Sequence, residues 1–247
     1  MSTTLALSES VVKIYKFKDL RQDNTHSHFF QMIEYNKVWC AAPGTLNDIN
    51  EFNFRMDYQP SNRTGVLLDE MIKKLGNLTF PSQMTTCYAL LNNKIEEFTK
   101  PQVSEIINKC RESIGVTSFS TSKSDPWLWE NYGGDGFGGV VEFEVPDEMV
   151  GETYHLVNYV EDNIFHIDIF LESQLGQSDE IFRNILCTKT LEWRPEREIR
   201  FLGKTPNVNI TFDAPVTGVI IGKSLSKPLA NRIEECCSDR NISIYQQ

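Results

Sequence analysis

The chain has 247 residues, 40% of them hydrophobic and 23% charged, and 24 Lys and Arg against 34 Asp and Glu give a net charge of −10. This composition is typical of a globular protein with a real core. Its acidity argues against broad, non-specific binding to nucleic acid, which relies on many Lys and Arg contacts to phosphate. No apolar stretch reaches the roughly 18 residues of a bilayer span.

The first residues carry no basic region before their short apolar run, so we predict no signal peptide and no membrane association. Six cysteines are present without a CxxC pair, which indicates reduced thiols in a cytoplasmic protein. Cys236 and Cys237 lie on a predicted helix, where at most one of two neighbours can face the core.

Hydrophobic periodicity and turn residues predict a mixture of helices and strands. In chain order, we expect strand 11–17, helix 25–35, strand 37–41, an extended segment near Phe54, helix 65–74, helix 101–114, strand 115–121, helix 126–132, strand 140–145, strand 154–160, a helix from Ser178, strands 196–202, 207–212 and 216–221, helix 225–238 and strand 242–245. Helices gather in the first half and strands in the second, which favours an α+β fold over a doubly wound sheet. No linker or repeat is visible, so we predict one domain.

Three motifs favour structural interpretations. The glycine-rich segment 133–139 contains a formal GxGxxG, but a helix precedes it and a strand follows, the reverse of a dinucleotide fingerprint. A turn or a close backbone approach is the better interpretation. His26 and His28 have no acidic or cysteine ligand at useful spacing and fit a polar helix start, and His166 with Asp168 gives only a weak metal signal.

Two other segments place polar groups beside apolar ones. Alternation puts Lys16 on the same strand face as Val12 and Ile14, where it either binds an anion or extends to the sheet edge. Alternation also places Ser118, Ser120 and Ser122 on one face of a strand, just before a group of aromatic residues in the sequence, Trp127, Trp129 and Tyr132. Hydroxyls beside aromatic rings suit a pocket for a flat polar ring, although ordinary core aromatics would give the same pattern.

The segment 196–200 carries the strongest signal. If it is a strand, Glu196, Glu198 and Arg200 lie on one face, with the two carboxylates about 7 Å apart. Such a row is either a salt-bridged surface or a reactive site.

Taken together, these motifs resemble a bacterial family long catalogued as a domain of unknown function. The matching residues are Tyr15-Lys16-Phe17, the turn LNDINEF, WENYGG leading into a strand, Lys189, and Trp193 followed by Glu196, Glu198 and Arg200. Asn131 replaces the family's usual histidine, and Ile49 replaces the proline after Asp48.

That family is in turn similar to the ADP-ribosyltransferase superfamily, whose enzymes carry a basic residue, a Ser/Thr element and a late glutamate on three strands. The resemblance implies a split mixed or antiparallel sheet with flanking helices, NAD as substrate, and a macromolecular acceptor, either protein or nucleic acid. A toxin or anti-phage effector held by an antitoxin protein is one possible role. It further implies that Glu198 stabilises the oxocarbenium-like ribose and that Glu196 orients or deprotonates the nucleophile.

In the same scheme Lys16 contacts a phosphate or a ribose oxygen, and Tyr15 belongs to the NAD site. Arg200 either holds the geometry of the glutamates or contacts the pyrophosphate. Ser120 and Thr121 steady the nicotinamide, on which Trp129 or Tyr132 stacks. Two alternatives remain open. One is an inactive binding module in which the glutamates form a structural network with Lys16 and Arg200. The other is a metal-dependent nuclease using Asp48, Glu51 and His166.

Overall fold

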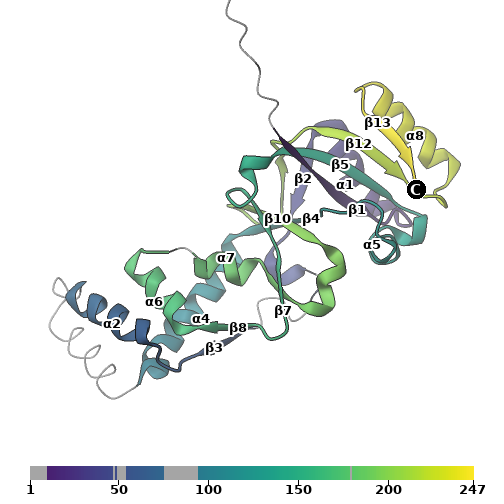
Figure 1. Cartoon of the computed structure of the whole chain (residues 1–247). Coiled ribbons are helices and arrows are strands. Elements are labelled where there is room, and N and C mark those ends of the chain that lie inside the picture. The colour runs from purple at the N-terminus through teal and green to yellow at the C-terminus, as the bar shows by residue number, and fades with distance from the viewer. Residues whose placement is uncertain (1–9, 47, 49–53, 75–93, 179) are drawn as a thin grey trace, which may run out of the picture. The chain divides into compact units, whose positions relative to one another are not determined.

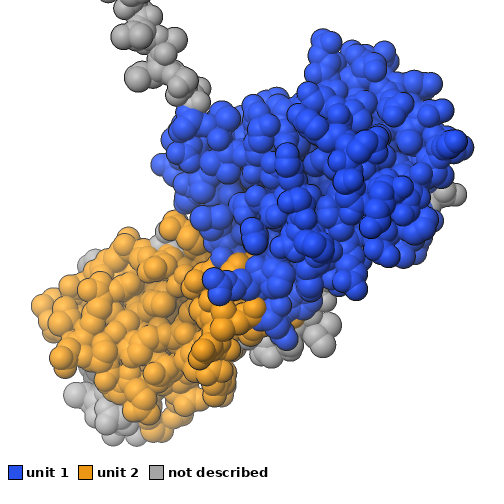
Figure 2. Space-filling view, turned by 45° about the vertical axis from the view of Figure 1, so that its right-hand side comes forward, with its two compact units in different colours: residues 1–41, 115–157, 192–247 blue, residues 42–114, 158–191 orange. Residues whose placement is uncertain are grey.

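The chain divides into two units (Figure 2), and the first of them contains a seven-stranded sheet (Figure 1). The structure is a computed structural model that describes residues 10–46, 48, 54–74, 94–178 and 180–247. The first unit comprises residues 1–41, 115–157 and 192–247, and the second comprises 42–114 and 158–191. Because each unit is assembled from separate stretches, the division does not follow consecutive domains, and the one-domain expectation stays a prediction.

Strand β1 lies in the middle of the sheet. The strand order is β13 (Ser243–Gln246), β12 (Val216–Ile221), β5 (Gly139–Pro146), β1 (Val11–Lys18), β4 (Gly115–Ser120), β10 (Glu198–Gly203) and β6 (Tyr154–Leu156). Only the β12–β13 pair is parallel, so the sheet is mixed. A two-stranded sheet of β2 (Lys37–Cys40) and β11 (Val208–Thr211) belongs to the same unit.

The two faces of the large sheet differ in chemistry because side chains alternate along each strand. One face, which we call the core face, carries Ile14, Phe119, Val141 and Ile199, all buried with residues of α1 (Asp23–Tyr35) and α8 (Lys227–Ser238). The other, which we call the polar face, carries buried hydrophilic side chains and a smaller apolar cluster. That cluster consists of Tyr15, Phe17, Leu128, Trp129, Val140 and Ile220.

A glycine-rich connection runs from α5 (Pro126–Asn131) through the 3₁₀ turn η3 (Gly134–Gly136) into β5. The helix-then-strand order confirms that the segment is not a dinucleotide fingerprint. At Gly138, a Cβ atom would lie 2.1 Å from the Lys18 carbonyl oxygen, so only glycine fits this close backbone approach.

The second unit contains four α-helices among its described residues. They are α2 (Asn62–Lys74), α4 (Ile95–Ser113), α6 (Ile167–Leu175) and α7 (Glu180–Leu186). Two short parallel pairs join β3 (Arg55–Asp57) to β8 (Ile164–His166) and β7 (Asn158–Val160) to β9 (Thr188–Thr190). Helices α2 and α6 are joined by Asp168, which accepts hydrogen bonds from Ser61 Oγ and Thr64 Oγ1.

The α+β class and most predicted elements are confirmed, with four corrections. The expected strand 154–160 is two strands in different sheets, because β6 pairs with β10 whereas β7 pairs with β9. Helix α4 begins at Ile95 and carries Pro101 in its interior. The elements β8, α6 and β9 were not predicted, and Asp168 therefore lies on a helix, apart from the strand of His166. Strand β10 begins at Glu198, so Glu196 lies outside it.

Two further expectations can be compared with the structure. No helix within the described ranges is both long and apolar enough to cross a membrane. Cys237 is fully buried and Cys236 only partly so, which confirms that one of the two faces the core.

Candidate functional site

Tyr15, Ser120 and Glu198 form a row across three neighbouring strands of the polar face. Tyr15 of β1 is the cross-strand partner of Ser120 of β4, and Ser120 is the partner of Glu198 of β10. Directly paired residues in antiparallel strands place their side chains on the same face. Three residues far apart in the sequence, each expected at one site, are thus brought together.

Strands β1 and β4 separate on either side of this row. Strand β1 pairs with β5 along its whole length, from Val11 to Lys18, but pairs with β4 only at Tyr15 and Ser120. The sheet is therefore split beside the candidate site.

Lys16 lies at this split, on the core face opposite Tyr15. Its Nζ donates to the Ser118 carbonyl oxygen at 2.6 Å and lies 5.7 Å from the centre of the Phe119 ring. Burial, with the nearby Lys18 charge as a second cause, lowers the pKa of Lys16 to about 7. The predicted face shared with Ile14 is confirmed. The charges of Glu198 and Glu196 also act on the Lys16 ammonium and raise its pKa, although less than burial lowers it.

Glu198 is held by Arg200, two residues along the same face of β10. Arg200 Nε donates to Glu198 Oε1 at 2.8 Å, and a second guanidinium nitrogen donates to Oε2 at 3.1 Å. Arg200 is fully buried and Glu198 is 4% exposed. A buried two-pronged pair of this kind fixes both side chains.

Glu196 reaches the same region from a different element. It ends the 3₁₀ helix η5 (Leu191–Glu196), and Arg197 has a left-handed backbone with φ of 46°. The sequence predicted that the two glutamates lie on the same face of one strand. This prediction is wrong, because Glu196 precedes the strand. The Glu196 carboxylate accepts a hydrogen bond from the Tyr132 hydroxyl, and its backbone carbonyl accepts one from Ser120 Oγ at 2.7 Å.

Thr121 follows Ser120 and continues the link between β4 and the turn before β10. Its backbone N–H donates to the Arg197 carbonyl oxygen at 2.9 Å, and its hydroxyl is 3.3 Å from the same oxygen. The serine–threonine element therefore fixes the segment that carries both glutamates.

The aromatic residues of α5 divide between core and surface. Trp129 is 3% exposed, packs edge-to-face on Phe17 at 5.5 Å between ring centres, and donates through Nε1 to the Lys123 carbonyl oxygen. Trp127 is only partly buried and lies 5.9 Å from the Tyr132 ring. Asn131 is exposed and donates to the Trp127 carbonyl oxygen at 2.8 Å.

Glu142 is a residue of this face that the sequence analysis missed. It pairs with Tyr15 across β1 and β5 and accepts hydrogen bonds from Lys13 at 2.8 Å and Thr217 at 3.0 Å. Burial first, and the Glu142 carboxylate second, raise the pKa of Tyr15 to about 12. Burial alone would raise the pKa of Glu142, but its hydrogen bonds lower it on balance. The sequence did contain a signal for this residue, because an acidic side chain inside the apolar strand 140–145 indicates a buried polar contact.

The residues of the nuclease hypothesis give no metal site within the described ranges. No group of three or more His, Cys, Asp or Glu side chains there could hold a metal ion. Glu51 lies outside those ranges. His166 instead caps α6 by accepting from the Asp168 N–H, and its other nitrogen lies 2.7 Å from the Gln59 carbonyl oxygen.

Comparison with protein-family models, curated proteins and solved structures finds no match to this chain. The family resemblance therefore rests on the motif residues themselves, and the function is argued from the geometry of the polar face.

Proposed function

We propose that the protein is an NAD-dependent ADP-ribosyltransferase whose reactive site lies on the polar face around Glu198. The observation that carries the proposal is the row of Tyr15, Ser120 and Glu198 on three adjacent strands beside the split in the sheet. The row supports the superfamily scheme because it aligns three of its parts by direct cross-strand pairing. These parts are the first strand, the Ser/Thr element and the late glutamate.

The proposed reaction breaks the bond between the nicotinamide nitrogen and C1′ of the ribose. Nicotinamide leaves with the electron pair of that bond, a nucleophilic oxygen or nitrogen of the acceptor bonds to C1′, and the acceptor loses one proton. Positive charge develops on the ribose in between. The negative charge of Glu198 stabilises that state, and Glu196 receives the proton or orients the nucleophile.

Arg200 holds the Glu198 carboxylate through both oxygens, which fixes the orientation that the charge would present to the ribose. Because Glu198 is 4% exposed, NAD binding requires the side chains that cover it to move. Arg200 then serves chiefly to orient Glu198.

The other NAD contacts follow from position. Ser120 and Thr121 hold the turn that carries the glutamates, and Tyr132 orients Glu196. We assign ring stacking on nicotinamide to Trp127 and Tyr132, because Trp129 is enclosed in the core. Lys16 takes part in phosphate binding only if its ammonium leaves the Ser118 carbonyl, and we give it no part in bond cleavage.

The acceptor is proposed to be a macromolecule, protein or nucleic acid, and an antitoxin protein is the proposed regulator. Both proposals follow from the family resemblance and rest on the transferase activity.

The deciding experiment measures nicotinamide release from NAD by the purified full chain, with and without cell lysate as a source of acceptor. Glu198→Gln keeps the shape and one acceptor oxygen but removes the charge. We expect this variant to lose release by about 100-fold or more, as when a preorganised electrostatic group is removed. Glu152→Gln, an exposed glutamate in a turn, is the matched control and should leave release unchanged.

Release that is absent in the wild type, with no thermal shift on adding NAD and with an intact fold, would overturn the proposal. Release that persists in Glu198→Gln would remove Glu198 from the reaction. Labelled ADP-ribose recovered on protein or on nucleic acid identifies the acceptor class, and free ADP-ribose alone indicates hydrolysis.

A second candidate function is an inactive binding module, favoured by the burial of the Glu198–Arg200 pair. In that case the pair is a structural element of β10. The module predicts that Glu198→Gln lowers stability while the wild type shows neither release nor a thermal shift with NAD.

A further inference from the structure

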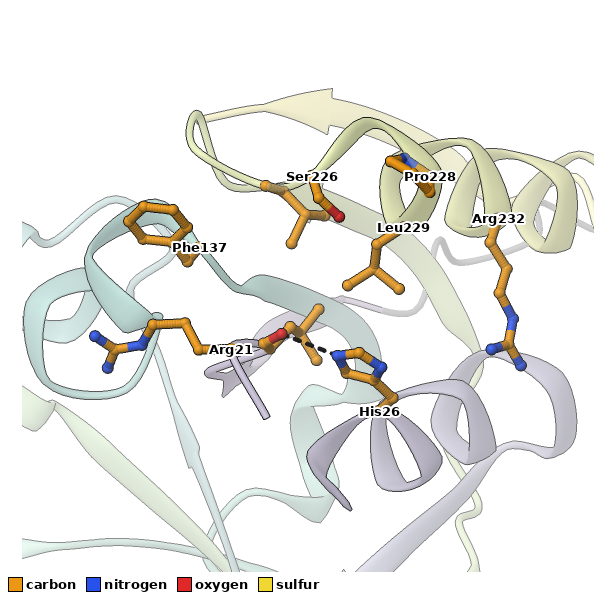
Figure 3. A pocket seen from close by; sticks show the side chains of 9 residues that line it. Arg21, His26, Phe137, Ser226, Pro228, Leu229 and Arg232 are labelled. Carbon is orange, nitrogen blue, oxygen red and sulfur yellow. Dashed lines mark hydrogen bonds between the residues drawn. The ribbon is translucent and has the colours of Figure 1, made fainter. Parts of the chain in front are cut away.

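The first unit has a hollow of about 570 Å³ beside the start of α8 (Figure 3). Helices α8 and α1, the segment after β1 and the glycine-rich connection form its walls. The lining residues are Leu20, Arg21, His26, Phe137, Leu225, Ser226, Pro228, Leu229 and Arg232. The volume lies within the range of small-molecule sites, about 300–1,000 Å³.

The lining combines an apolar surface with cationic groups. Leucine, proline and phenylalanine side chains form most of it, and Phe137 is 45% exposed. In Figure 3 Leu229 and Arg232 extend from α8 toward α1, which carries His26. A ligand with an apolar body and an anionic group could therefore contact the apolar lining with one part and a cationic side chain with the other.

Arg21 is already neutralised by a carboxylate. Its Nε lies 2.9 and 3.0 Å from the two Asp19 oxygens, and the charge of Asp135 is also near enough to raise the pKa of Arg21. Arg21 thus contributes little net positive charge to the hollow.

Arg232 is different, because no ion pair joins it to any residue that the structure describes. Its guanidinium carbon lies 3.9 Å from the centre of the Phe30 ring. Stacking on an aromatic face fixes the plane of a guanidinium and leaves its N–H edges available for a planar anion. Ser226, six residues earlier, caps α8 without a side-chain hydrogen bond and supplies a second donor in the lining.

We propose that this hollow binds a small monocarboxylate with a flat or branched apolar body. The carboxylate pairs with Arg232, and the apolar body covers Leu229, Leu20 and Phe137. Arg232, which has no ion pair with a described residue, suits a single negative charge, whereas Asp19 and Asp135 on the Arg21 side repel a dianion such as a phosphate monoester. The site uses none of the residues of the proposed transferase and does not depend on that activity.

The test uses 1-naphthaleneacetate as the probe and its neutral amide as an isostere, with binding to the full chain measured by calorimetry. We expect the acid to bind at least about fivefold more tightly than the amide, the factor of one moderate ion pair. Arg232→Gln should remove that difference. Phe137→Ala should weaken both compounds, because an exposed apolar contact is lost without a cavity in the core.

Arg240→Gln, just beyond the end of α8 and outside the lining, is the matched control and should behave as wild type. The proposal is overturned if the acid fails to bind at millimolar concentration, or if Arg232→Gln leaves the preference for acid over amide intact. Tighter binding of 1-naphthyl phosphate than of the acid would overturn the monoanion assignment. Circular dichroism of each variant confirms that these outcomes do not arise from unfolding.

Discussion

Glu198 and Arg200 lie side by side on the polar face of β10, joined by hydrogen bonds of 2.8 and 3.1 Å and almost completely shielded from water. The pair stands at one end of the row formed with Ser120 and Tyr15. A buried ion pair at this place has two consequences. It holds Glu198 in one orientation, and it makes the stability of the sheet depend on both partners.

Arg200→Met is expected to lower the free energy of unfolding by about 3–5 kcal/mol, because Glu198 is left buried without its guanidinium. Urea denaturation followed by circular dichroism measures the loss.

The double variant Glu198→Leu with Arg200→Met is the control. It removes both charges and should recover much of the loss, because a buried pair replaced by apolar residues is often neutral. A loss below about 1 kcal/mol in Arg200→Met would mean that the pair is far more solvated than the structure indicates.

Two glycines are expected to respond oppositely to alanine. At Gly138 the added Cβ would lie 2.1 Å from the Lys18 carbonyl oxygen and 2.7 Å from that of Gly133, both backbone atoms. We expect Gly138→Ala to destabilise the protein by more than about 3 kcal/mol or to prevent folding.

Gly65, inside helix α2, has nothing within 4 Å of the added Cβ. Gly65→Ala should therefore stabilise the protein by about 0.5–1 kcal/mol. Thermal and urea unfolding of Gly138→Ala and Gly65→Ala test both expectations. Effects of the same sign and size in the two variants would contradict the predicted difference.

The strands of the polar face could be predicted from the sequence, but the register in which they pair could not. Strands 115–121 and 140–145 follow from composition and alternation. The alignment of Tyr15 with Ser120, and of Ser120 with Glu198, depends on which residues pair between strands more than 70 positions apart. Local pattern carries no information on that pairing.

The largest error concerned Glu196, and its cause lies in one backbone angle. The side chains from Glu196 to Arg200 alternate in the pattern expected of a strand. However, the backbone of Arg197 adopts a φ of 46°, which breaks the strand. A non-glycine residue rarely adopts this left-handed backbone conformation. The alternating pattern therefore did not indicate it. The sequence likewise does not show which side of the short helix α5 packs on Phe17, and therefore which of its tryptophans is enclosed.

The two tryptophans of α5 should differ sharply in their contribution to stability. Trp129→Ala removes a buried ring from the cluster with Phe17 and should cost about 3–5 kcal/mol. Trp127 is partly exposed, so Trp127→Ala should cost only about 1 kcal/mol. If Trp127 stacks on nicotinamide, the same variant raises KM for NAD with a smaller change in kcat. Equal destabilisation by the two variants would contradict the burial pattern.

Lys16 is expected to make stability depend on pH between neutral and alkaline conditions. Its pKa is about 7 in the folded protein against an ordinary value of 10.5, so between these values the unfolded chain binds more protons than the folded one. Stability therefore rises with pH across that window, and the unfavourable contribution of the charged ammonium is fully present below pH 7. Burial also lowers the pKa of Lys18, which adds a slope of the same sign.

The Lys16→Met variant should show a smaller increase in the free energy of unfolding between pH 7 and pH 9 than the wild type. It should also be more stable relative to wild type at pH 7 than at pH 9, because the cost of burying the charge is gone. Lys204→Met, at an exposed position, is the control and should keep the wild-type slope. Urea titrations at the two pH values provide the measurement. Identical slopes in Lys16→Met and wild type would show that Lys16 titrates as an ordinary solvated lysine, and its ammonium would then be free to leave the Ser118 carbonyl for a phosphate at little cost.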